Sequence, residues 1–229
     1  MSSLSQQLLE TPQSDKKTKE RQFKGLSLSE RQQLRREKLI EAGIQAYGTH
    51  GFFSVTVKDI CTEAKLTERY FYESFKKSEH LFQTIFLKLI DELQHNVMQA
   101  ILQAGHDPEK MIRAGLTALL TTLKNNPKMA RIIYIDAMLV QELHNQATIR
   151  ETMSRFDRMI YAFVMLMIPQ MNRSERELSL IASGLNGYVT QIAIHWVMND
   201  FKQSMDEVLS CCSIVFLSLL NSINAEKFT

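Results

Sequence analysis

Residues that interrupt helices are scarce in this sequence. Its 229 residues include only eight glycines and four prolines, which favours long uninterrupted helices. No stretch alternates polar and apolar residues as a half-buried strand does, which argues against a β-sheet. The sequence therefore predicts an all-α protein with about nine helices.

Cysteines and long apolar runs are also few. The three cysteines are Cys61, Cys211 and Cys212. An adjacent pair points in two directions on a helix, so a disulfide framework is not expected and a reducing compartment is. No segment reaches the roughly 18 continuous apolar residues of a membrane span, and the N-terminus lacks a signal-peptide pattern. We expect a cytoplasmic protein without a membrane partner.

Groupings of catalytic residue types are missing as well. No two histidines have the i, i+3 or i, i+4 spacing that holds a metal on a helix. We find no glycine-rich phosphate loop and no Gly-x-Ser-x-Gly elbow. A helical enzyme that binds an acidic substrate through basic residues would need a convergent set of titratable groups, which we cannot assemble. We expect no catalytic residues, no metal site and no cofactor.

The positive charge of the chain is concentrated near its N-terminus. The formal net charge is only +2, yet residues 16–38 hold nine basic and three acidic side chains. Such a block attracts phosphate. Residues 1–26 have no helical period and are interpreted as a flexible basic arm, either bound to DNA or simply solvated. Two further regions follow, at residues 27–78 and 79–229.

Local signals place the helix boundaries. Ser27 and Glu30 form a capping-box pattern that begins the first helix, and Gly48 and Gly51 are expected to end it. Ser78 is expected to cap the fourth helix. The remaining helices are expected at about 57–64, 68–75, 108–125, 127 onward, 146–168, 174–198 and 205–221.

Two short helices with a tight turn, at residues 57–75, fit a helix-turn-helix, in which the second helix enters the DNA major groove. Two ordinary core helices would show the same period. In the DNA-binding interpretation Arg69 can bind guanine through two hydrogen bonds, Tyr70 can contact thymine methyl groups, and Tyr72 can hold phosphate. The expected core of the pair is Ile60, Ala64, Leu66, Phe71 and Phe75.

The residues around this pair strengthen the DNA-binding interpretation. Residues 36–52 resemble the first helix of the TetR family of bacterial transcriptional regulators. The motifs that follow at the family's spacing are Thr56-Val-Lys-Asp-Ile60, Ala64, Leu66-Thr67, Phe71-Tyr72, Phe75 and Glu79-His-Leu81. The resemblance covers residues 36–81 without a gap. It implies a helix-turn-helix regulator that forms a homodimer and has a ligand chamber in its C-terminal helices.

The resemblance and the exposed positions together give the candidate DNA-binding residues. They are Thr56, Lys58, Thr67, Glu68, Arg69, Tyr70, Tyr72, Lys76 and Lys77. The sequence departs from the family at two places. Lys65 stands where the family has glycine in the turn, and must tolerate an unusual backbone angle unless the turn differs. Ser78 stands where the family has a phosphate-binding lysine, a role that Lys76 or Lys77 could supply.

The last two expected helices are apolar around most of their circumference, and a second apolar stripe suggests a partner. Complete burial within one subunit is the alternative. Small residues at Ser183, Gly184 and Gly187 would let a neighbouring helix approach closely. The predicted dimer interface comprises Leu185, Tyr188, Ile192, Trp196, Val208, Cys212, Val215, Phe216 and Leu219.

Methionine is abundant, with twelve residues, and suits either an adaptable ligand pocket or ordinary core packing. Weak candidates for ligand binding are Arg131, Tyr134 and Met138, although Arg131 and Asp136 can equally form a buried structural pair. The function predicted is a ligand-responsive transcriptional regulator, a repressor released by a small apolar molecule. The alternative is an architectural DNA-binding protein without a ligand, which should lack a large apolar cavity.

Overall fold

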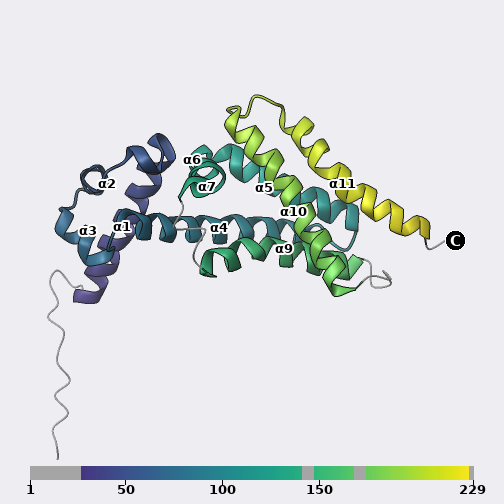
Figure 1. Cartoon of the computed structure of the whole chain (residues 1–229), viewed down its shortest axis with the longest axis horizontal. Coiled ribbons are helices and arrows are strands. Elements are labelled where there is room, and N and C mark those ends of the chain that lie inside the picture. Colours follow the sequence, from purple (N-terminus) through teal and green to yellow (C-terminus); the bar gives the residue numbers. More distant parts are fainter. Residues whose placement is uncertain (1–26, 141–146, 168–173, 227–229) are drawn as a thin grey trace, which may run out of the picture.

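The computed structural model describes residues 27–140, 147–167 and 174–226 (Figure 1). The predicted basic arm, residues 1–26, lies outside them. The described residues are helical and contain no strand. They form α1 (Leu28–His50), α2 (Val57–Ala64), α3 (Glu68–Ser74), α4 (Ser78–Gln103), α5 (Pro108–Asn125), α6 (Pro127–Arg131), α7 (Ala137–Leu139), α9 (Ala147–Met167), α10 (Glu175–Met198) and α11 (Met205–Glu226).

Two short irregular elements complete the described chain. A 3₁₀ turn, η1 (Phe52–Ser54), follows α1, and a π-helical turn, η2 (Ile132–Asp136), joins α6 to α7. Residues 127–139 thus form one continuous helical run. Counted as a single helix, this run brings the described helices to nine, which confirms the predicted all-α class.

Side-chain caps explain where several helices begin. Ser27 and Glu30 form the predicted capping box of α1, and Ser174 and Glu177 form that of α10. The Asp107 side chain accepts from two backbone amides at the start of α5. Each such cap is worth about 1 kcal/mol. These starts are local and were predicted correctly.

Gly51 ends α1 as predicted, but the expectations for Gly48 as a helix end and Ser78 as a cap were wrong. Gly48 lies inside α1, which ends at His50 with Gly51 as its C-cap. A Cβ atom at Gly48 would stand 2.4 Å from the Cβ of Lys128, so glycine there permits close approach of α6. Ser78 is the first residue of α4 and not its cap; Lys77 is the N-cap residue, and its side chain does not cap the helix. The close approach of Lys128 explains why a glycine stands inside α1.

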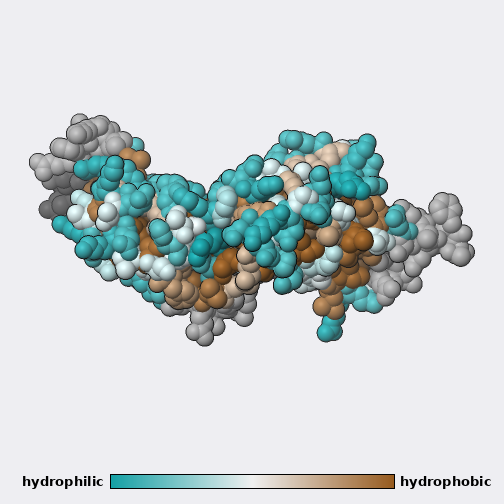
Figure 2. Space-filling view, turned by 90° about the horizontal axis from the view of Figure 1, so that it is seen from above, coloured by the Kyte–Doolittle hydropathy of each residue, from teal (hydrophilic) through white to brown (hydrophobic). Residues whose placement is uncertain are grey.

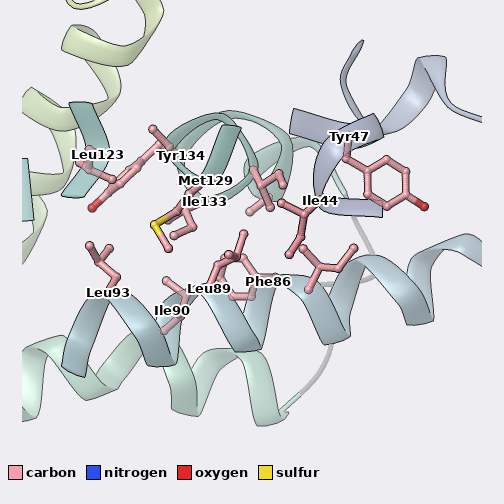
Figure 3. Packing of buried hydrophobic residues seen from close by; sticks show 14 of the residues in the cluster. Ile44, Tyr47, Phe86, Leu89, Ile90, Leu93, Leu123, Met129, Ile133 and Tyr134 are labelled. Atoms are coloured by element: carbon pink, nitrogen blue, oxygen red, sulfur yellow. The ribbon is translucent and has the colours of Figure 1, made fainter. Parts of the chain in front are cut away.

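The long helix α4 is the spine of the molecule (Figure 1). Its first turns pack against α1, and the rest packs against α5 and α9. Figure 3 shows part of the buried junction, where the side chains of three helical segments point toward one another: Ile44 from α1, Phe86, Leu89 and Ile90 from α4, and Met129 and Ile133 from α6 and η2. One hydrophobic core therefore joins the α1–α3 end to the C-terminal helices.

Candidate DNA-binding interface and ligand cavity

A tight turn joins α2 to α3. The Leu66 amide donates to the Cys61 carbonyl at 2.9 Å, and the Lys65 amide donates to the Thr62 carbonyl at 3.1 Å. This pair of bonds is the Schellman arrangement, which requires a left-handed residue. Lys65 supplies it, with φ 54° and ψ 43°. The turn is therefore the one that glycine usually makes, with lysine held in its strained conformation.

The recognition helix α3 has one buried and one exposed face. Phe71 is fully buried and its ring lies 5.9 Å from that of Phe75, which anchors the helix to the core. On the opposite side the Arg69 side chain is 84% exposed, and Tyr72 is 57% exposed. This arrangement leaves polar groups of α3 accessible to a DNA groove.

The other candidate DNA-binding residues surround this face. Among these candidates, Tyr70 is half-buried. Six others are exposed: Thr56, Lys58, Thr67, Glu68, Lys76 and Lys77. The Thr56 hydroxyl caps α2 by accepting from the Asp59 amide at 3.2 Å. It also donates to the Asp59 carboxylate at 2.6 Å, and this hydrogen bond lowers the pKa of that carboxyl. The Thr67 side chain makes no capping bond at the start of α3.

The sequence patterns did not predict two residues of this region, Arg35 and Glu73. Arg69 Nε donates to Glu73 at 3.0 Å, and the other Glu73 oxygen pairs with Arg35 at 3.9 Å. The Arg35 guanidinium also stacks on the Tyr70 ring, 4.5 Å from its centroid. The i, i+4 spacing of Arg69 and Glu73 signals their pairing. The contribution of Arg35 depends on how α1 crosses α3 and leaves no local signal.

The predicted dimer residues divide into two groups. Leu185, Trp196, Val208 and Cys212 are at most 5% exposed. They face the core of their own chain, so their assignment to a dimer surface is corrected. The apolar stripe that carries them packs inward, which periodicity alone could not decide. The remaining five are partly exposed: Tyr188, Ile192, Val215, Phe216 and Leu219.

A different stripe of α10 and α11 is exposed. In α10 it contains Leu180, 67% exposed, with Gly184 and Gly187, where an added Cβ would meet nothing within 4 Å. In α11 it contains Ile214, 59% exposed, and Ser218. Figure 2 shows hydrophobic residues gathered on the half of the molecule that holds these helices, whereas the α1–α3 end is mostly hydrophilic.

An apolar cavity lies between the helices of the C-terminal region. Its volume is about 80 Å³, and its lining comes from α4, α5, α9, α10 and α11. The lining includes Met111, Met159 and Phe163, and Asn186 in it donates to Asp157 at 2.7 Å. Among the described residues that line the cavity, Asn186 is the only polar one and none is charged. Because ligand pockets usually span about 300–1,000 Å³, a ligand larger than a few atoms must enlarge this cavity.

The three weak ligand candidates lie away from the cavity. Arg131 Nε stands 3.7 Å from the buried Asp136 carboxylate, next to Gly51 at the end of α1. Tyr134 is buried at the junction with α4, and Met138 is 47% exposed. Arg131 and Asp136 thus form the structural pair that was the alternative reading.

Over the ranges that the structure describes, no helix combines the length and the apolar character needed to cross a membrane. Within the same ranges, histidine, cysteine, aspartate and glutamate form no group of three or more that could hold a metal ion.

Known proteins resemble the chain in sequence and in fold. It is 26% identical over 171 residues to a probable acrEF/envCD operon repressor from Escherichia coli, which is 72% of this chain and 76% of the relative. A TetR-like transcriptional regulator from Rhodococcus shares the fold with TM-score 0.58 and 20% identity, over 81% of this chain and 95% of the other. FadR from Bacillus subtilis, solved with stearoyl-CoA, matches with TM-score 0.61 and 16% identity, over 80% and 96%. No protein-family model matches the chain.

Proposed function

We propose that this chain, a transcriptional regulator of the TetR type, is a homodimeric repressor that a small apolar ligand releases from its operator. The observation that carries the proposal is the exposed face of α3 at one end of a molecule whose apolar cavity lies at the other. The chain is a regulator and not an enzyme, and we place it in the cytoplasm, where bacterial operators lie. The comparisons do not favour an architectural protein without a ligand.

The exposed stripe of α10 and α11 supports the homodimer. Two helices from each chain can form a four-helix bundle, in which Gly184 and Gly187 allow close approach and Leu180 and Ile214 become buried. A second copy of the same stripe is self-complementary under two-fold symmetry. The two α3 helices can then enter successive major grooves if they stand about 34–36 Å apart.

The lining of the cavity supports an apolar, uncharged ligand portion. A buried charge on the ligand would find no ionic partner among the described lining residues, which makes its desolvation costly. The adaptable side chains of Met111 and Met159 allow the walls to re-form around a larger occupant. Enlarging the cavity must shift at least one of its lining helices, which are α4, α5, α9, α10 and α11.

The junction of α1, α4 and α6 supports coupling between the cavity and DNA. The end of α1 is held to α6 and η2 through Gly48 and Gly51, and α4 runs from this junction into the cavity wall. A ligand that prefers the enlarged cavity changes the angle at which both copies of α3 meet DNA. It can lower DNA affinity only by as much as it prefers that state.

Substituting Arg69 tests the DNA-binding role of α3. Arg69→Ala should weaken binding to a selected operator by about 1–3 kcal/mol and relax its base preference. The operator is first selected from a pool of randomised duplexes, and both proteins are then titrated on it and on scrambled DNA. Arg113→Ala, the same change on α5, is the control and should alter neither the operator affinity nor the base preference. Equal losses on both DNAs would show that Arg69 does not read bases.

A further inference from the structure

Glu73 lies on the recognition helix but carries the charge that DNA repels. It was not among the predicted contacts, and nothing in a phosphate-binding surface calls for a carboxylate there. We infer that Glu73 is a positioning residue, which holds Arg69 of α3 in the orientation that reads a base pair. This inference rests on the proposed DNA-binding function.

Three side chains, Arg35, Glu73 and Arg69, form a continuous series of contacts. One carboxylate oxygen of Glu73 accepts from Arg69 Nε at 3.0 Å, and the other lies 3.9 Å from a terminal nitrogen of Arg35. Arg35 belongs to α1, and its side chain is only 21% exposed. The more buried arginine thus fixes the carboxylate, and the carboxylate fixes the exposed arginine.

The stacking of Arg35 on Tyr70 holds the network from a second side. The guanidinium carbon lies 4.5 Å from the Tyr70 ring centroid, within the range of a cation–π contact. Tyr70 and Glu73 are successive neighbours on one face of α3, three residues apart. Arg35 therefore contacts two residues on adjacent turns of α3 and holds this face of the helix against α1.

The atom that Glu73 binds leaves Arg69 able to recognise a base. Recognition of guanine uses two parallel donors of one guanidinium. Because Glu73 occupies Nε, the two terminal amino groups of Arg69 remain for such a contact. A long arginine side chain otherwise loses considerable rotamer freedom on binding, and prior orientation reduces this loss.

Fold stability does not explain the pair of Glu73 with Arg69. The Arg69 side chain is 84% exposed and that of Glu73 is 35% exposed, and ion pairs so accessible to water add little to stability. The carboxylate also costs affinity for DNA, since it repels phosphate. We therefore expect the Glu73 carboxylate to improve the selectivity for a base pair rather than the affinity for DNA.

The experiment compares base preferences of four full-length proteins selected on randomised duplexes: wild type, Glu73→Gln, Arg69→Ala and the double variant. Glu73→Gln should relax preference about three- to tenfold at the same base pair that Arg69→Ala relaxes. The double variant should be no less selective than Arg69→Ala alone. Glu63→Gln, which removes an exposed carboxylate from α2, is the control and should leave preference unchanged.

A second measurement follows the arginine itself. In the free protein, the Arg69 Nε–H resonance should shift in Glu73→Gln and stay in place in Glu63→Gln, while melting curves of all variants remain alike. Relaxed preference at a different base pair would mean that Glu73 reads DNA directly, and this would overturn the inference, as would unchanged preference in Glu73→Gln. A wild-type protein that selects no sequence would instead overturn the proposed function.

Discussion

At the scale of single residues, Lys65 shows how this chain makes its turn without glycine. A side chain in the left-handed region costs roughly 1–2 kcal/mol per residue, and Lys65 has φ 54°. Lys65→Gly should therefore raise the free energy of unfolding by about 0.5–1 kcal/mol, once the greater freedom of glycine in the unfolded chain is subtracted.

Chemical denaturation of Lys65→Gly and wild type measures this difference. Gln99→Gly, an exposed substitution inside α4 about one turn before its end, is the matched control and should cost about 0.5–1 kcal/mol. If both glycine variants were destabilised alike, the turn would carry no strain at Lys65.

Asp136 makes the free energy of unfolding depend on pH with the opposite sign to that of an ordinary salt-bridged carboxylate. Burial raises its pKa above the usual 3.8, and Arg131 and the Phe52 amide offset this only in part. The folded protein thus binds the proton more tightly than the unfolded chain does. The resulting stabilisation is present below pH 3.8 and is lost as pH rises through the raised pKa.

The Asp136→Asn variant removes this titration while keeping the shape of the side chain. Relative to it, wild type should lose stability as pH rises from about 3.5 and then level off. Urea unfolding of both proteins across this range measures the difference. A wild type that gains stability relative to Asp136→Asn over the same range would show that the pair with Arg131 lowers the pKa instead.

At the scale of elements, the contact between α1 and α6 depends on Gly48. Alanine favours a helix over glycine by about 1 kcal/mol, but a Cβ atom here would stand 2.4 Å from that of Lys128. Gly48→Ala should therefore lower the free energy of unfolding by about 1–2 kcal/mol, because α6 must move away. Thr49→Ala, at the next and exposed residue, should change it by less than about 0.5 kcal/mol. A stabilised Gly48→Ala protein would mean that helix propensity outweighs the contact.

Sequence patterns predicted the elements better than their contacts. Ser27 and Asp107 mark helix starts because a cap acts within three residues, and the spacing around Phe71 reveals which face of α3 is buried. Gly48 was misjudged because its reason for being glycine is Lys128, far along the chain. For the same reason the Arg35–Glu73 contact of the candidate site could not be foreseen, since it depends on the crossing of two helices.

The C-terminal helices show a second limit of periodicity. Both stripes of α10 are apolar enough to be buried, and the residues alone do not say which packs against the same chain. Leu185 was expected in the dimer seam and lies in the core, whereas Leu180 is exposed. The small volume of the apolar cavity likewise depends on how the side chains interlock, which a count of methionines does not reveal.

At the scale of the whole molecule, the proposed function requires that two chains bind DNA together. Two recognition helices on one rigid dimer add their contacts, while a monomer retains only one set. A charge placed in the exposed stripe should separate the chains without disturbing either fold, because Leu180 makes little contact within its own chain. Leu180→Glu is therefore the informative variant, and Leu102→Glu, equally exposed at the end of α4, is its control.

The decisive measurement combines sedimentation and operator titration on one sample of each variant. We expect wild type and Leu102→Glu to sediment as dimers and to bind the selected operator tightly. Leu180→Glu should sediment as a monomer, keep the helical content of wild type and lose operator affinity by at least about tenfold. A monomeric Leu180→Glu that binds with wild-type affinity would contradict both the dimer requirement and the coupling mechanism that depends on it.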